Sequence, residues 1–249
     1  MIIDNPKLEH IAGLRQLWKQ AFGDSDEYLD LFFETGFSCD RCFCICLEDR
    51  PVAAVYTFDC RWQEKNVAYL YALAVEEQHR GRGLSRLLLT DVHGKLQSAG
   101  YAGAVLEPAS DWLAQYYATM GYRPCGGRQQ ITACAGGKAE PVQELGVLGY
   151  EQNRKALLPD GGVEQTGAVT RLLQRYAALY GGEDFVAAVS RQAPEVLEYL
   201  GDRAKLPGLL KALHMEQAQV RLPGPEPTAM YLDFAGNREV PTYFGLPMD

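Results

Sequence analysis

The chain has 249 residues and suits one large domain or two small ones, with enough apolar material for a full core. Its net charge of −8 argues against nucleic-acid binding through a basic surface. The acid excess suits a cationic substrate, although solubility alone explains it more simply. No apolar run approaches bilayer length and the N-terminus has no signal-like core, so we expect a cytoplasmic protein without membrane partners.

The first predicted elements are a strand over residues 2–4 and helices over about 7–22 and 26–35. Two strands, 42–48 and 52–60, follow and are joined by a tight turn. These strands contain or flank several of the seven cysteines of the chain.

The odd number of cysteines argues against a disulfide framework in a cytoplasmic protein. Cys42, Cys44 and Cys46 alternate, so on a strand they project from one face, where free cysteine packs as a small hydrophobe. No second pair of Cys or His lies at zinc-site spacing, and we expect no metal. The seven are Cys39, Cys42, Cys44, Cys46, Cys60, Cys125 and Cys134.

The most informative stretch begins at Tyr69. The apolar run Tyr69–Val75 predicts a buried strand, and a helical pattern of leucines and valine follows from Leu84 to Leu96. Gly81 and Gly83 therefore lie in a strand-to-helix turn, where backbone N–H groups and the positive helix end favour a phosphate. A Walker loop and a dinucleotide turn are both excluded, because the residues after the glycines are of the wrong type. The residues expected on the buried helix face are Leu84, Leu87, Leu88, Val92 and Leu96.

The pattern filled by Gln78, Gly81 and Gly83 resembles the acetyl-CoA signature of the GNAT superfamily of N-acetyltransferases, Gln/Arg-x-x-Gly-x-Gly/Ala. A predicted strand at 103–106 follows the helix, and residues 117–122 resemble the family's Tyr-x-x-x-Gly-Phe/Tyr ending. The resemblance covers about half the chain. It implies an α+β fold with a mixed, mostly antiparallel sheet whose central strands are splayed apart.

We expect a GNAT N-acetyltransferase domain over residues 1–137 and a smaller C-terminal α+β domain of unknown role over 138–249. The second half carries no glycine phosphate turn, and it loosely resembles the added domain of GNAT proteins of the enhanced-intracellular-survival type, as a degenerate GNAT-like half. Its predicted helices cover 150–157, 169–180 and 206–213, and its predicted strands 185–190, 217–222, 230–234 and 242–246.

The resemblance implies acetyl-CoA as co-substrate, with pantetheine bonded to the splayed strand near Leu73 and Val75 in the manner of an added strand. It also implies that the first two helices wall the acceptor pocket. The segment 24–34 is acidic, which suits either a negative lip for an amine or a solvated helix face. The implied cofactor-binding residues are Leu73, Ala74, Val75, Gln78, His79, Arg80, Gly81, Arg82, Gly83, Leu84, Ser85, Ser110 and Tyr117.

The expected reaction is transfer of the acetyl group to a primary amine by direct attack in a ternary complex. Tyr117 matches the position of the family's proton donor to the leaving thiolate, and its neighbour Tyr116 is expected in the core. The general base is open: candidates are Glu107, the chain-terminal carboxylate of Asp249, and a water held by Tyr69 or Tyr71. A catalytically inactive acyl-CoA sensor or scaffold is the alternative, and the oligomeric state is open, a homodimer included.

Overall fold

The computed structural model describes residues 2–246, and its backbone contacts divide the chain into two compact units. The first unit contains the residues up to Cys60, Lys65–Leu106 and Leu232–Arg238. The second contains Arg61–Glu64, Glu107–Tyr231 and the chain from residue 239 onward. The boundary expected after residue 137 stays a prediction.

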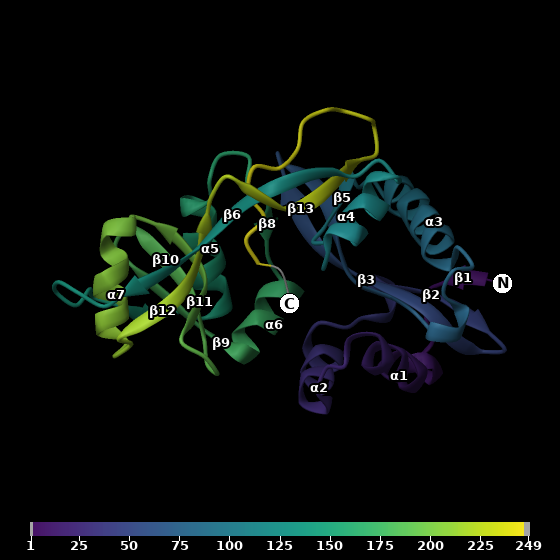
Figure 1. Ribbon diagram of the computed structural model, residues 1–249, viewed down its shortest axis with the longest axis horizontal. Coiled ribbons are helices and arrows are strands. Elements are labelled where there is room, and N and C mark those ends of the chain that lie inside the picture. Colours follow the sequence, from purple (N-terminus) through teal and green to yellow (C-terminus); the bar gives the residue numbers. More distant parts are fainter. Residues whose placement is uncertain (1, 247–249) are drawn as a thin grey trace. The chain divides into compact units, whose positions relative to one another are not determined.

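The first unit is built on a sheet with the strand order β1-β2-β3-β4-β5. The pairs β1/β2 and β2/β3 are antiparallel, and β4/β5 is parallel. Figure 1 shows α1 and α2 on one face of this sheet and α3 on the other. The bounds are β1 Ile2–Asp4, α1 Ile11–Phe22, α2 Asp26–Thr35, β2 Cys42–Leu47, β3 Arg50–Trp62, β4 Lys65–Val75, α3 Leu84–Ser98 and β5 Gly103–Leu106.

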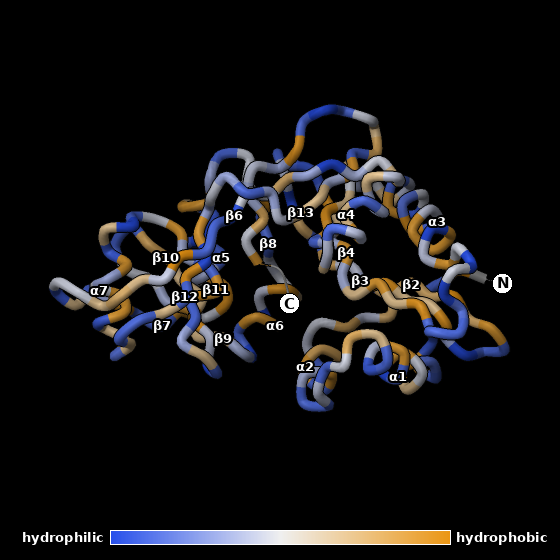
Figure 2. Tube along the Cα trace, in the orientation of Figure 1, coloured by the Kyte–Doolittle hydropathy of each residue, from blue (hydrophilic) through white to orange (hydrophobic). Residues whose placement is uncertain are grey.

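Aromatic side chains dominate the packing of α1 and α2 on the sheet. Trp18 of α1 lies 4.4 Å from the ring of Phe32 and 5.0 Å from that of Tyr56, centroid to centroid. All three are buried, and the hydrophobic stretches of β2 and β3 stand out in Figure 2. On the other face α3 buries the predicted leucines and valine except Leu87, which is 43% exposed; Leu89 is buried instead.

The second unit has the strand order β13-β6-β12-β11-β10-β9-β7. Strand β10 shows how its sheet is covered: Phe185 and Ala187 pack in a cluster with α7, and Val186 and Ala188 in a cluster with α5 and α6. The bounds are α4 Asp111–Ala118, β6 Arg123–Cys134, β7 Gln143–Glu144, α5 Val147–Leu157, β8 Glu164–Gln165, α6 Ala168–Tyr176, β9 Ala177–Gly182, β10 Phe185–Ser190, β11 Glu195–Gly201, α7 Leu206–Ala212, β12 Gln217–Pro223 and β13 Glu226–Asp233.

The structure confirms a mixed α+β fold with a mostly antiparallel sheet, and it corrects two predicted elements of the second half. The helix expected over 169–180 ends at Tyr176, because Ala177–Gly182 pairs antiparallel with β10. The strand expected over 242–246 is a buried extended segment with a single bridge, Gly162 to Tyr243. Strand β11 was not predicted. Among residues 2–246, no helix combines the length and apolar character that a bilayer crossing requires.

A buried charge network lies inside the second unit. The Arg154 guanidinium donates to both carboxylate oxygens of Glu198, at 2.7 and 2.9 Å, and to Gln165 Oε1 at 3.1 Å. Tyr150 and Tyr243 also donate to Glu198, at 2.7 and 2.8 Å. Glu198 is fully buried, so the four hydrogen bonds that it accepts from Arg154, Tyr150 and Tyr243 replace its hydration.

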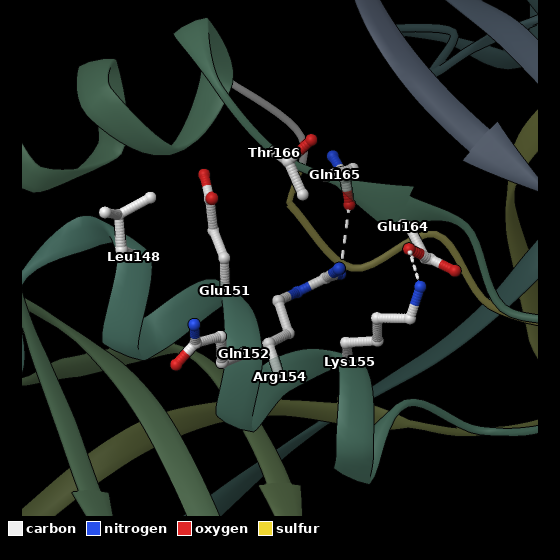
Figure 3. A pocket seen from close by; sticks show the side chains of 8 residues that line it. All are labelled: Leu148, Glu151, Gln152, Arg154, Lys155, Glu164, Gln165 and Thr166. Atoms are coloured by element: carbon white, nitrogen blue, oxygen red, sulfur yellow. Dashed lines mark hydrogen bonds and ion pairs between the residues drawn. The ribbon is translucent and has the colours of Figure 1, made fainter.

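A cavity of about 260 Å³ lies beside this network, between α5 and β8. Figure 3 shows two contacts between side chains that line it: Arg154 bonds to the amide of Gln165, and Lys155 bonds to Glu164 at 3.0 Å. Glu151 accepts from the Gly167 amide at 2.7 Å. The cavity walls are therefore engaged in structural contacts of this unit.

We expect Glu198→Ala to lower the free energy of unfolding by about 3–5 kcal/mol, because it leaves the Arg154 guanidinium buried without its counter-charge. Urea denaturation would measure the loss. The control is Lys155→Ala, which removes an exposed pair and should cost under about 1 kcal/mol. Equal losses in the two variants would contradict this account of the network.

Candidate functional site

Strand β4 is irregular at Ala72, whose φ of +49° lies in the left-handed region that non-glycine residues rarely adopt. The parallel pairing of β4 with β5 joins Val67–Tyr69 to Gly103–Val105 and ends there, although β4 continues to Val75. The end of β4 therefore runs beyond its paired part. This is the kinked strand, leaving its parallel neighbour, that the resemblance implies.

The turn after β4 has the backbone conformation that its glycines predict. Gly81 and Gly83 have φ of +73° and +76°, and no other atom lies within 4 Å of where a Cβ would stand on either. Gly83 is the N-cap of α3, and no side chain caps this helix. Because the first amides of a helix lack partners within it and carry the positive end of its dipole, this turn favours an anion.

Glu76 anchors the start of this turn. Its carboxylate, 8% exposed, accepts from both Arg50 guanidinium nitrogens and lies 3.0 Å from His79 Nδ1. Its backbone N–H donates to Val52 O at 2.8 Å, and its carbonyl accepts from the His79 amide at 2.9 Å. The Arg50 hydrogen bond lowers the pKa of Glu76 and outweighs its desolvation.

Most residues predicted to bind the cofactor form one continuous segment of the first unit. Leu73–Val75 end β4, Gln78 and His79 lie in the 3₁₀ turn Glu77–His79, and Leu84 and Ser85 begin α3. Arg80 Nε donates to the Val75 carbonyl at 3.0 Å, so this arginine closes the turn onto the end of β4.

The other predicted residues belong to the second unit or lie outside the described residues. The Ser110 hydroxyl caps α4 by accepting from the Leu113 amide at 3.3 Å, as its sequence predicts. Glu107 accepts from Arg128, and their side chains are 13% and 11% exposed. The ion pair gives Glu107 a structural partner, and its role as a base stays a prediction. Asp249 lies outside the described residues.

The two adjacent tyrosines of α4 differ from the expectation. Tyr117 is buried and packs 5.7 Å from the ring of Tyr122, whereas Tyr116 is partly exposed and stacks on the exposed Trp112. The expected core position of Tyr116 is therefore wrong. Burial, with a smaller contribution from Tyr116, raises the pKa of Tyr117 to about 12, so its hydroxyl keeps its proton at neutral pH.

Three of the five acids in the segment 24–34 have partners on α1. Lys19 of α1 pairs with Asp26 at 2.6 Å, and Arg15 with Asp30 at 2.5 Å. Asp24 accepts from the Trp18 indole at 2.7 Å. These three acids hold α2 against α1, which favours the structural explanation of the acidic run over a negative lip.

Comparison with known proteins bears on the type of domain and on the fold. Residues 3–125 match the family model described as an acetyltransferase (GNAT) domain. The match covers just under half of the chain, and this part is similar to a GNAT acetyltransferase domain. The match does not reach residues 138–249, whose role stays a prediction.

Solved structures are similar over both halves of the chain. A GCN5-related N-acetyltransferase from Kribbella flavida has a TM-score of 0.70 at 16% identity, over 92% of this chain and 70% of its own. A GCN5-related N-acetyltransferase from Anabaena variabilis ATCC 29413 has a TM-score of 0.74 at 14% identity, over 92% of this chain and 72% of its own. Eis1 from Mycobacterium abscessus has a TM-score of 0.65 at 13% identity, over 91% of this chain and 66% of its own. At these identities the likeness shows the fold alone. No curated protein matches the chain.

The sequence analysis missed Glu76 and Arg50, which hold the turn in place. Their pairing links β3 to the end of β4, and no local pattern predicts it, because the two residues are 26 positions apart. The sequence feature that could have indicated Glu76 is its position directly after the apolar run Tyr69–Val75, where a buried carboxylate needs a partner.

We expect Glu76→Gln to weaken coenzyme A binding about tenfold, or about 1.4 kcal/mol, because the amide cannot hold the Arg50 guanidinium by charge. Titration calorimetry would measure it. The control is Glu77→Gln, an exposed neighbour with the same change of charge, whose affinity should be unchanged. If both substitutions acted alike, general electrostatics and not anchoring would explain the loss.

The same pair predicts a pH dependence. The lowered pKa of Glu76 means that its stabilisation is complete above the ordinary glutamate pKa and is lost as the pH falls through the lowered value. Coenzyme affinity of the wild type should therefore fall in that acid range, and the affinity of Glu76→Gln should change less.

Proposed function

We propose that this protein transfers the acetyl group of acetyl-CoA to a primary amine by direct attack in a ternary complex. The observation that carries the proposal is the glycine turn at the N-terminus of α3, which directly follows the kinked end of β4. The match to the GNAT domain supports acyl transfer, and the amine acceptor comes from the resemblance.

The turn fits the diphosphate of coenzyme A. Its two glycines leave the approach to the α3 amides open, and Arg82 adds an exposed positive charge between them. The backbone of Leu73–Val75, beyond the β5 pairing, is the edge along which pantetheine would add as a strand. When bound, acetyl-CoA supplies the activated thioester, and we propose a backbone N–H near Leu73 as donor to the acyl oxygen.

We propose Tyr117 as the proton donor. A phenol with a pKa raised to about 12 holds its proton more tightly than a thiol, whose ordinary pKa is about 8.5. Tyr117 would therefore act mainly by donating a hydrogen bond that stabilises the departing thiolate.

The proton of the acceptor needs a different group. Tyr71 precedes the irregular Ala72, and its hydroxyl lies 2.7 Å from that of Tyr28 on α2. Glu107 is already engaged by Arg128. We therefore favour a water at Tyr71 over Glu107 as the route for this proton.

A second candidate function is acyl-CoA binding without catalysis. The stretch Val67–Val75 holds no carboxylate, and the nearest candidate along the chain, Glu107, is ion-paired. Release of coenzyme A in the presence of a pooled set of primary amines would separate the two functions. Binding of acetyl-CoA without any release would favour the sensor.

We expect Tyr117→Phe to lower turnover by about a hundredfold or more while the Kd for acetyl-CoA stays nearly unchanged. Steady-state kinetics and calorimetry would measure the two effects. Tyr116→Phe, on the exposed side of α4, is the matched control and should retain activity. Unchanged turnover in Tyr117→Phe would remove the donor role, and an equal loss of binding would make it structural.

The pH profile gives a further check on the same residue. Tyr117 keeps its proton below a pH of about 12, so its ionisation should not lower wild-type turnover between neutral pH and pH ~10. Any decline of turnover in that range should therefore also be present in Tyr117→Phe.

A further inference from the structure

Three potential metal ligands converge at the start of the first unit. His10 ends the 3₁₀ turn Leu8–His10, and Cys44 and Cys46 project from the same face of β2. One ligand atom of each lies within 4.8 Å of the others. Cys44 Sγ is 3.7 Å from Cys46 Sγ, which is 3.9 Å from His10 Nδ1.

These separations are close to the edges of a zinc tetrahedron. Bonds of about 2.3 Å to sulfur and about 2.0–2.1 Å to nitrogen place two sulfurs about 3.8 Å apart and a sulfur and a nitrogen about 3.6 Å apart. The distances from Cys46 to Cys44 and to His10 thus need shifts of a few tenths of an ångström at most, and His10 and Cys44 lie within 4.8 Å of each other. The Asp4 carbonyl oxygen lies 3.6 Å from Cys44 Sγ, at an edge length that also suits an oxygen ligand.

The histidine is held in the tautomer that such a site needs. The Lys7 amide donates to His10 Nδ1 at 3.2 Å, so Nδ1 carries the lone pair and Nε2 the ring proton. Nδ1 is also the nitrogen that faces Cys46. A cation at Nδ1 would take over this lone pair in place of the Lys7 amide.

Burial and charge favour a divalent ion with affinity for sulfur. His10 and Cys44 are buried, whereas Cys46 is partly exposed and leaves a route from solvent. Two thiolates and a neutral imidazole around Zn²⁺ sum to zero charge, which a buried position tolerates best. The set of sulfur and nitrogen ligands is also the one that zinc prefers.

We propose that His10, Cys44 and Cys46 bind one Zn²⁺ ion, with the Asp4 carbonyl or a water as the fourth ligand. Binding forms two Zn–S bonds and one Zn–N bond and releases the two thiol protons to solvent. The ion joins the segment before α1 to β2, and its role is structural. The sequence predicted no metal because no second pair of Cys or His lies at zinc-site spacing, and no local pattern joins His10 to Cys44, 34 residues later.

The test is zinc binding by the full chain, purified reduced and treated with chelator. Titration should give one Zn²⁺ per chain, and the thermal midpoint should rise by about 5 °C or more at a hundredfold excess over the Kd. Co²⁺ in place of Zn²⁺ should give a thiolate-to-cobalt charge-transfer band and the intense visible bands of tetrahedral coordination. This spectrum uses the wild-type chain and does not depend on any variant folding.

Cys44→Ser, Cys46→Ser and His10→Gln should each weaken zinc binding at least tenfold and change the cobalt spectrum. The control Cys134→Ser removes an exposed thiol of β6 and should change neither. A wild-type chain without the cobalt band, or zinc affinity lost only in Cys134→Ser, would overturn the proposal. The three side chains would then be packed as hydrophobes, or bind metal only adventitiously.

Discussion

The positive φ of Ala72 is the constraint on which the proposed site depends. A left-handed alanine costs roughly 1–2 kcal/mol, and it persists only where the surroundings fix it. Here the strand on either side is held, by pairing with β5 up to Tyr69 and by the contacts of Glu76 just beyond the strand end. The irregular residue thus lies between two fixed points, and the end of β4 is left for a ligand to pair with.

The glycine turn adds a binding site for an anion directly after this irregular strand. Glu76 and Arg50 fix where the turn starts, Arg80 ties it back to Val75, and α3 supplies its positive end. The binding groups are mainly backbone amides, whose positions depend on the fold more than on side-chain identity.

What the sequence predicted well was local. The glycines before α3 predict a left-handed turn, and the strand Gly103–Leu106 has the predicted bounds. Both predictions depend on short-range sequence patterns. Residues decided by distant partners were missed. Ala177–Tyr180 continue a helical apolar pattern but pair as a strand with β10, and Arg50 meets Glu76 only in the folded sheet.

The most direct measurement of the central claim is calorimetric titration of coenzyme A into Gly81→Ala and Gly100→Ala. Both glycines have positive φ, +73° and +87°, with open space around the absent Cβ, so the substitutions carry similar backbone strain. They lie before and after α3. The account predicts that only Gly81→Ala loses coenzyme A binding; retained affinity in Gly81→Ala, or equal loss in both variants, would contradict it.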